Sequence, residues 1–245
     1  MRLCYFIPGS LSCGVLGAEE MDRRSDFLRQ NCLAGEEVEV RDAPDGPASV
    51  ESAAEEQVAS SALIAGLPRL EAEGFDAAII GCFGDPGLAA GRELVKIPLV
   101  GPAQASIHLA AQLGDRFGIL TVLEEVVPSL RRLMRAYGME GLMADLRAVQ
   151  VPVLELRGRR DEVLDLLSEA GRAALAAGAD ALVLGCMTMG FLGLAEELQE
   201  RLAAPVVNPV LAALWTAETM VAGRLHPSRR AYPRPPKPVE VPFSG

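Results

Sequence analysis

The sequence is poor in aromatic residues and in histidine. Only 4% of its 245 residues are Phe, Trp or Tyr, and two are His. It has no Cys-x-x-Cys pair, and neither histidine has other ligand-type residues around it at the spacing of a metal site, so no metal is expected. The five cysteines are an odd number spread through the chain. This argues against a disulfide framework and favours a reducing cytoplasm.

Positive charge and long apolar runs are also scarce. There are 23 Lys and Arg against 33 Asp and Glu, a net charge of −10, which argues against nucleic acid and anionic membranes as partners. No apolar stretch reaches the ~18 residues that a membrane span needs. The chain runs from Met1 straight into an expected strand, without the long apolar region of a secretory signal. We therefore expect a cytoplasmic protein that acts on a small molecule.

One stretch of the sequence occurs twice. Gly74–Cys82 returns as Gly178–Cys186, and Ile97–Pro102 is matched by Ala204–Pro209. Each copy begins with a glycine and an aspartate (Asp76 or Asp180) that end a helix and turn. A short apolar run, typical of a buried parallel strand, and a Gly-Cys pair follow. The repeat indicates two similar α/β halves.

Strands and helices are predicted to alternate through each half, which is typical of an α/β protein with parallel sheets. We expect two pseudo-symmetric lobes, each with a four-stranded parallel sheet flanked by helices, and an active site in the cleft between the lobes. The first lobe would comprise residues 1–101 and 208–225, and the second residues 102–207. Residues 226–245 form a Pro-rich extended tail, either a strap on the acidic body or on a partner subunit, or a disordered segment.

Three local predictions concern the segments around the repeated strands. We expect a strand at Val149–Val153, and a loop at Met187–Gly190 followed by a helix over 191–202. After Cys82 we expect a helix with Asp85 as its N-cap and Pro86 at its first position. Such a helix would place the positive end of its dipole near the thiol and favour the thiolate.

Cys82 and Cys186 are expected to lie one residue past the ends of the two matching strands. In open α/β sheets, ligands bind at the carboxyl ends of the strands. A thiolate at one such place can remove a proton from a carbon next to a carbonyl, and a thiol at the other can return one to the opposite face. A single cysteine there is more often a buried apolar residue, as we expect for Cys4, but two at matching positions favour proton transfer.

The two Gly-Cys pairs, their placement in two α/β halves and the stretch Gly81–Leu88 resemble the aspartate/glutamate/hydantoin racemase superfamily. The hydantoin racemase branch is the most similar, and the likeness extends from residue 1 to about residue 223. This resemblance implies that Cys82 and Cys186 are the two proton-transfer residues and that no cofactor is needed. The loops at Ser10, Thr121 and Thr188 would bind the substrate.

The residues after each cysteine differ from those of glutamate racemases, which usually carry Cys-Asn-Thr and Cys-Thr-His. The corresponding residues here are Cys82-Phe83-Gly84 and Cys186-Met187-Thr188. This argues against free glutamate or aspartate, because Phe83 and Met187 would make a less polar pocket wall. We expect a homo-oligomeric racemase or epimerase that acts on a 5-substituted hydantoin or a related amino-acid derivative.

Three alternatives stay open at this point. The first is an aspartate/glutamate-type racemase. The second is a maleate isomerase or an arylmalonate decarboxylase, because relatives with this fold catalyse both reactions. The third is a non-catalytic small-molecule sensor, which would not need thiols at matched strand ends.

Overall fold

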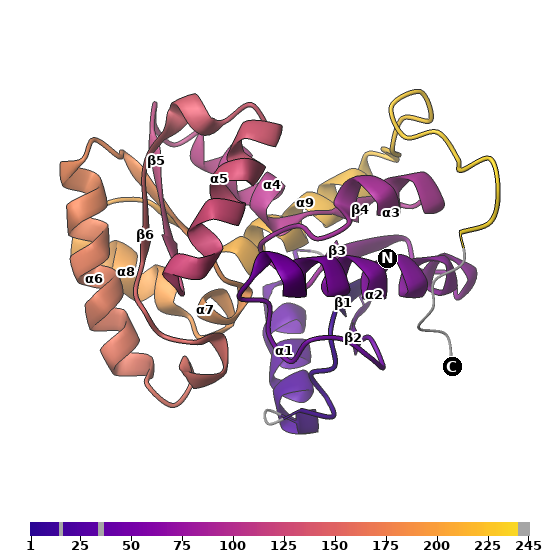
Figure 1. Cartoon of the computed structure of the whole chain (residues 1–245), viewed down its shortest axis with the longest axis horizontal. Coiled ribbons are helices and arrows are strands. Elements are labelled where there is room, and N and C mark those ends of the chain that lie inside the picture. Colours follow the sequence, from indigo (N-terminus) through magenta and orange to yellow (C-terminus); the bar gives the residue numbers. More distant parts are fainter. Residues whose placement is uncertain (15–16, 34–36, 240–245) are drawn as a thin grey trace. The chain divides into compact units, whose positions relative to one another are not determined.

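The computed structural model describes residues 1–14, 17–33 and 37–239, and the chain divides into two compact units (Figure 1). Unit 1 comprises Met1–Val50, Ala54–Gly101 and the chain from Ala213 onward. Unit 2 comprises Glu51–Ala53 and Pro102–Ala212. Each unit has its own parallel sheet and its own buried core.

Unit 1 is built on a four-stranded parallel sheet with the strand order β2-β1-β3-β4. Its strands are β1 (Arg2–Ile7), β2 (Glu37–Asp42), β3 (Ala77–Ile80) and β4 (Leu99–Val100). Its helices are α1 (Gly17–Asn31), α2 (Ala53–Ala72) and α3 (Leu88–Leu94). The two inner strands are apolar and almost completely buried, as the short apolar runs in the sequence predict.

Unit 2 has a second four-stranded parallel sheet with the order β6-β5-β7-β8. Its strands are β5 (Phe117–Thr121), β6 (Met143–Ala148), β7 (Ala181–Leu184) and β8 (Val206–Val207). Its helices are α4 (Pro102–Ala110), α5 (Val127–Ala136), α6 (Arg160–Ala176), α7 (Met187–Phe191) and α8 (Leu194–Leu202), with short 3-10 turns at η1 (Glu124–Val126), η2 (Glu140–Leu142) and η3 (Val153–Glu155). Helices α6 and α8 pack against each other on one side of the sheet (Figure 1).

The two sheets have the same strand order when counted within each unit: second, first, third, fourth. Asp76 and Asp180, which match in the repeat, also accept equivalent hydrogen bonds in the two units. Asp76 accepts a hydrogen bond from the backbone N–H of Arg2 at 2.8 Å, and Asp180 accepts one from the N–H of Arg116 at 2.9 Å. Each aspartate thus ties the turn before the third strand to the start of the first strand. The prediction of two four-stranded parallel sheets flanked by helices is confirmed.

Helix α9 (Pro209–Ala222) begins in unit 2 and continues into unit 1. Its later turns are held against the end of α1. The indole N–H of Trp215 donates to the carbonyl of Asn31 at 3.1 Å, and the Glu218 carboxylate accepts from the N–H of Leu33 at 2.9 Å. The segment His226–Val239, called the tail below, follows α9 and is part of unit 1. Residues 240–245 of the predicted Pro-rich segment lie outside the described residues.

The strand predicted at Val149–Val153 is wrong. The strand β6 lies earlier, at Met143–Ala148, where it pairs with β5 at the edge of the sheet. An edge strand needs only part of its surface buried. The sequence of β6 therefore includes polar residues and lacks the continuous apolar run from which a strand is predicted. Val149 and Val151 are buried in the core of unit 2, and their N–H groups donate to the carbonyls of Thr121 and Val122, but the regular pairing with β5 ends at Ala148. Their apolar pattern therefore marks a buried segment just past the end of the strand.

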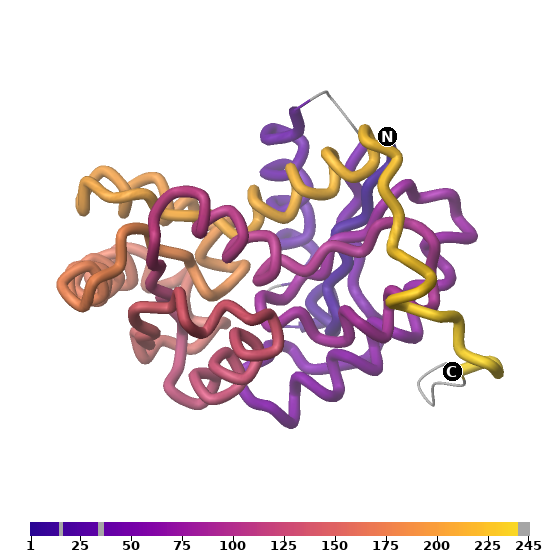
Figure 2. The backbone as a smooth tube through the Cα atoms, turned by 90° about the horizontal axis from the view of Figure 1, so that it is seen from above, coloured from indigo at the N-terminus to yellow at the C-terminus, as the bar shows by residue number. Residues whose placement is uncertain are grey.

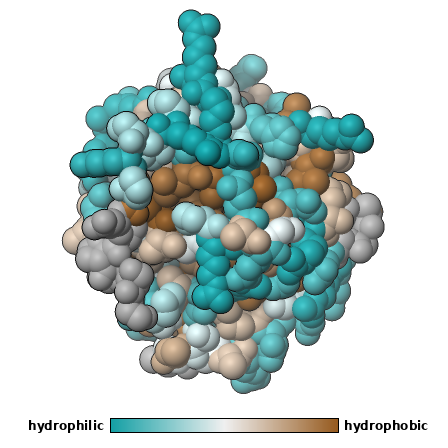
Figure 3. Space-filling model, turned by 90° about the vertical axis from the view of Figure 1, so that its right-hand side faces the viewer, coloured by the Kyte–Doolittle hydropathy of each residue, from teal (hydrophilic) through white to brown (hydrophobic). Residues whose placement is uncertain are grey.

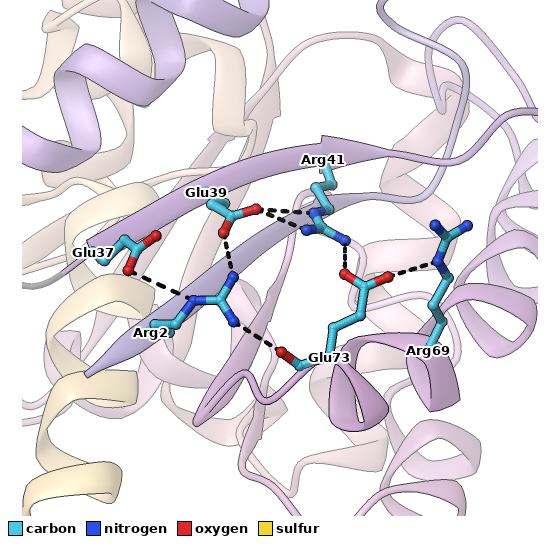
Figure 4. Close-up of polar contacts among 6 residues, drawn as sticks. All are labelled: Arg2, Glu37, Glu39, Arg41, Arg69 and Glu73. Carbon is cyan, nitrogen blue, oxygen red and sulfur yellow. Dashed lines mark hydrogen bonds and ion pairs between the residues drawn. The ribbon is translucent and has the colours of Figure 1, made fainter.

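An ion-pair network covers one face of β1 and β2 in unit 1 (Figure 4). Arg41 bonds to Glu39 at 2.8 Å and also to Glu73, and Arg2 donates to Glu39 at 2.6 Å. Arg69 binds the other oxygen of Glu73 at 2.7 Å. Because β2 is an edge strand, this layer of charge also discourages pairing with another chain.

The same face holds a ring and a buried thiol. The guanidinium groups of Arg2 and Arg41 lie 4.4 and 4.8 Å from the centroid of the Phe75 ring, a cation–π arrangement. Cys4 lies beneath, fully buried, and this burial raises the pKa of its thiol to about 12. The expectation that Cys4 is a core residue is confirmed, and its thiol is unsuited to acid–base chemistry near neutral pH.

The network makes the stability of the protein dependent on pH. Hydrogen bonds from Arg41 to Glu39, and from Arg69 and Arg41 to Glu73, hold the pKa of each carboxyl group below its ordinary value of 4.5. Since the folded-state pKa values are depressed, this stabilisation is present above about pH 4.5 and is lost as the pH falls through the folded-state values.

We expect Arg41→Gln to lower the melting temperature by a few degrees at pH 7, with the deficit shrinking below pH 4, where the carboxylates become protonated in the wild type too. Thermal unfolding followed by circular dichroism from pH 7 to pH 3 measures this. Arg135→Gln is the matched control, because Arg135 makes a single exposed ion pair with Glu140 and should matter little. A deficit of the same size at every pH would contradict the electrostatic explanation.

Candidate active site

The first predicted cysteine lies at the carboxyl edge of the sheet in unit 1. Strands β1 and β3 are neighbours, and the N–H of Gly81 donates to the carbonyl of Phe6 at 2.7 Å, which extends their pairing past the end of β3. A Cβ atom at Gly81 would lie 3.0 Å from the Cα of Ile7, so a side chain there would crowd the neighbouring strand. The chain thus passes close to β1 at Gly81, and Cys82 follows directly at the sheet edge.

Unit 2 repeats this arrangement at the second cysteine. The N–H of Gly185 donates to the carbonyl of Leu120 at 2.7 Å, and a Cβ atom at Gly185 would lie 3.0 Å from the Cβ of Thr121. The Thr121 hydroxyl donates to the Gly185 carbonyl at 3.3 Å, which holds the two strand ends together. Cys186 therefore occupies in unit 2 the place that Cys82 occupies in unit 1.

The surroundings of Cys82 combine apolar and acidic groups. Cys82 is partly exposed, whereas Phe83 is buried. A Cβ atom at Gly84 would lie 4.0 Å from the Sγ of Cys82 and 3.9 Å from the Cδ of Glu56. Glu56, on the first turn of α2, therefore lies near the thiol. From the sequence alone, Glu56 is only an acidic residue near a helix N-terminus, where negative charge is favourable. No pattern in the sequence links these two residues.

The predicted start of the helix after Cys82 is wrong. Helix α3 begins at Leu88, and its N-cap is Gly87 in the left-handed conformation, with φ 71°. Asp85 also has a left-handed backbone, with φ 51°, and is buried. A Cβ atom at Gly101 would lie 2.5 Å from its Oδ2, so this carboxylate packs against Gly101 instead of capping a helix. The helix therefore begins two residues later than expected, at Leu88 instead of Pro86, and the effect of its dipole on Cys82 stays a prediction.

A helix does begin directly after the other cysteine. Cys186 is the N-cap residue of α7 and has an extended backbone, with φ −154° and ψ 132°. The loop expected at Met187–Gly190 is therefore wrong, and so is the single helix expected over 191–202. The chain instead forms α7, breaks at Gly193 with φ 66°, and continues as α8. Cys186 and Met187 are both buried.

A residue further along the chain holds α7 in place. The side-chain amide of Asn208 donates to the carbonyl of Gly190 at 3.1 Å, and its oxygen accepts from the N–H of Val210 at 3.0 Å. A Cβ atom at Gly190 would lie 2.5 Å from the Asn208 Oδ1, so this approach needs glycine. Asn208 holds the end of the turn that carries Thr188, and it occupies in the repeat the position of Gly101.

The loop that carries Ser10 is tied to the loop after β2. The N–H of Ser12 donates to the Asp42 carboxylate at 2.6 Å, and the N–H of Ala43 donates to the carbonyl of Ile7 at 3.0 Å. Ser10 itself is partly exposed. The predicted site residues thus form two groups, each at the carboxyl edge of its own sheet: Ser10, Cys82, Phe83 and Gly84 in unit 1, and Thr121, Cys186, Met187 and Thr188 in unit 2.

The described residues contain neither a disulfide nor a metal-binding cluster. All five cysteines are free thiols. Residues 1–14, 17–33 and 37–239 contain no cluster of three His, Cys, Asp or Glu side chains placed to hold a metal ion. Within the same ranges, none of the helices has the length and apolar character required to span a bilayer.

Comparison with known proteins agrees with the arrangement of the two cysteines in a repeated α/β fold. Residues 21–217 match the family model for Asp/Glu/hydantoin racemase. The chain belongs to this family. The racemase is 38% identical to a hydantoin racemase of Rhizobium meliloti over 78% of its own length and 80% of the relative. It is 34% identical to a hydantoin racemase of Paenarthrobacter aurescens over 91% and 92% of the two chains.

A solved structure extends the likeness to the whole fold. The allantoin racemase from Klebsiella pneumoniae superposes on the racemase with a TM-score of 0.89 at 30% sequence identity, over 99% of this chain and 97% of the other. The predicted family and its hydantoin racemase branch are therefore confirmed. The protein is an isomerase of the racemase type, and the non-catalytic sensor is discarded.

Proposed function

We propose that this racemase inverts the carbon next to a carbonyl in a 5-substituted hydantoin, with Cys82 and Cys186 as its two proton-transfer residues. One observation carries the proposal. Gly81 and Gly185 make the same hydrogen bond, at 2.7 Å, to the neighbouring strand of their own sheets, so each unit presents one thiol at the equivalent strand end. A duplicated fold with one thiol in each copy suits a reaction whose substrate and product are mirror images.

The proposed reaction moves one proton off the carbon and another onto it. The thiolate of one cysteine takes the hydrogen from C5 of the hydantoin, and the electron pair of the broken C–H bond delocalises onto the C4 carbonyl oxygen. The thiol of the other cysteine then gives its proton to the opposite face of C5. The first cysteine ends as a thiol and the second as a thiolate, ready for the reverse reaction. Cysteine suits both roles because its ordinary pKa of about 8.5 lies close to neutral pH.

The neighbours of the two cysteines support a ring-shaped substrate over a free dicarboxylic amino acid. Phe83 and Met187 are both buried next to a catalytic candidate and bring no charge. The ring amides would instead need polar partners, which the hydroxyls of Ser10, Thr121 and Thr188 are proposed to supply. The relatives named hydantoin racemase and allantoin racemase agree, since allantoin is itself a hydantoin with a ureido group at C5.

A direct assay tests the substrate class. L-5-benzylhydantoin and allantoin should each lose optical activity much faster with the enzyme than without it, whereas L-glutamate and L-aspartate should be poor substrates. Polarimetry or circular dichroism measures this. A 5,5-disubstituted hydantoin is the control, because it has no hydrogen at C5 and must keep its optical activity. Rapid racemisation of glutamate with no action on hydantoins would refute the substrate assignment and leave the two-cysteine mechanism intact.

Comparison of the two substrates tests whether the enzyme prefers an apolar or a polar substituent at C5 of the hydantoin. Apolar walls at Phe83 and Met187 favour the benzyl group, so we expect a higher kcat/KM for 5-benzylhydantoin than for allantoin.

We further propose that the enzyme works without metal or organic cofactor, in the cytoplasm and as a homo-oligomer.

A further inference from the structure

The tail runs along unit 1 (Figures 1 and 2) and is held there by one arginine and one tyrosine. Arg229 donates from Nη1 to the carbonyls of Arg92 at 3.1 Å and Glu93 at 3.0 Å, and from Nη2 to the carbonyl of Val95. These carbonyls lie at the C-terminus of α3, where a cation is favourable. Arg92 in turn donates to the Tyr232 hydroxyl at 3.3 Å. The tail is therefore a strap on this chain's own body, one of the arrangements expected from the sequence.

Docking gathers positive charge around a cavity of about 580 Å³. The residues that line it are Lys96, His226, Pro227, Arg229, Pro233 and Arg234. No acidic side chain is among them. The ammonium group of Lys96 and the guanidinium of Arg234 make no ion pair within the described part of the chain. The Glu71 carboxylate lies nearby, but it accepts the backbone N–H of Lys96, at 2.6 Å.

This concentration of cations contrasts with the rest of the protein. The whole chain carries a net charge of −10, yet the tail contains four Arg and Lys residues and no Asp or Glu. It lies on the right-hand side of Figure 1, the side shown in Figure 3, where long hydrophilic side chains project around a band of apolar residues. Arg229 is bonded to neutral carbonyls, and no carboxylate of the described residues forms an ion pair with it.

We propose that the tail cavity binds a small anion with at least two negative charges, carried by phosphate or carboxylate oxygens. Cations held close together repel one another, and a bound polyanion relieves this repulsion. The planar guanidinium of Arg234 suits a bidentate contact with either group, and Lys96 adds a mobile point charge. The rings of Pro227 and Pro233 offer apolar walls for a carbon skeleton, and the volume is that of a small-molecule site.

This site is independent of the racemase reaction. A hydantoin ring carries at most one negative charge near neutral pH, so the substrate is not the expected ligand. The lining residues also exclude every residue proposed for catalysis or for substrate binding. Failure of either proposal therefore leaves the other intact.

Titration calorimetry with pyrophosphate, inorganic phosphate and succinate, at constant ionic strength, tests the site. We expect saturable binding of one anion per chain for at least one of them, and a higher melting temperature in its presence. The double variant Lys96→Ala/Arg234→Ala should bind at least about tenfold more weakly, because it loses two charged contacts. Binding of the phosphates alone, or of succinate alone, would support the site and identify which oxygens it selects.

The matched control is Arg230→Ala/Lys237→Ala, which removes the same charge from residues of the tail that do not line the cavity. This variant should bind as the wild type does. Equal weakening in the two double variants would overturn the proposal, because it would show a diffuse response to net charge. Absence of saturable binding by all three anions would overturn it as well. Arg229 is left intact because it holds the tail in place, and circular dichroism of each variant checks that it is folded.

Discussion

Replacing either Cys82 or Cys186 by serine should reduce racemisation by about 10²–10⁴-fold or more, the usual effect of losing a positioned acid–base group. The hydroxyl of serine is far too weak an acid to form its anion near neutral pH. Both residues are needed for inversion, so the two single variants should be similarly inactive. Optical rotation of 5-benzylhydantoin over time measures the loss. Cys13→Ser is the control, since Cys13 is exposed and lies outside both groups of site residues, and it should keep full activity.

The two variants should nevertheless differ in deuterium oxide. A variant that keeps one working thiolate can still remove and return the hydrogen that faces it, without inverting the centre. Cys82→Ser should therefore exchange the C5 hydrogen of one enantiomer, and Cys186→Ser that of the other. Proton NMR of each pure enantiomer records the exchange. If either variant racemised like the wild type, or if both exchanged the same enantiomer, the two-cysteine assignment would be wrong.

Gly9→Ala is expected to cause the second large effect, on both folding and activity. A Cβ atom at Gly9 would lie 2.2 Å from the carbonyl oxygen of Pro47, which is backbone and cannot rotate away. The loop that carries Ser10 or the loop that carries Pro47 must move. We expect a loss of about 1–3 kcal/mol in the free energy of unfolding, typical of overpacking. We also expect a fall in kcat/KM, because Ser10 would be displaced.

Chemical denaturation and the hydantoin assay measure the two effects of Gly9→Ala. Gly141→Ala is the control, because nothing lies within 4 Å of a Cβ atom at Gly141, and it should change neither. A Gly9→Ala protein with wild-type stability would show that the loops yield easily. Normal stability loss with an unchanged kcat/KM would instead remove Ser10 from the proposed substrate contacts.

The sequence by itself predicted the parallel sheets and the places of the two cysteines. Each repeated strand is a run of buried apolar residues that ends in glycine, and this is a property of neighbouring residues. A Cβ atom at either glycine before the cysteines would lie only 3.0 Å from an atom of the neighbouring strand, so glycine suits both positions. Repetition of the whole pattern made the prediction strong, because two unrelated buried cysteines would seldom share the same setting.

The tertiary structure alone decided the surroundings of those cysteines. The backbone of Asp85 is left-handed and its carboxylate packs against Gly101, and Asn208 bonds to Gly190 of α7, 18 residues away in the sequence. The tail is placed by Arg229, which binds a carbonyl 137 residues earlier. Local periodicity records which side of an element is buried. Periodicity does not indicate which distant side chain or carbonyl a residue will bond to. Such distant partners accompany the local conformations at Asp85, α7 and the tail.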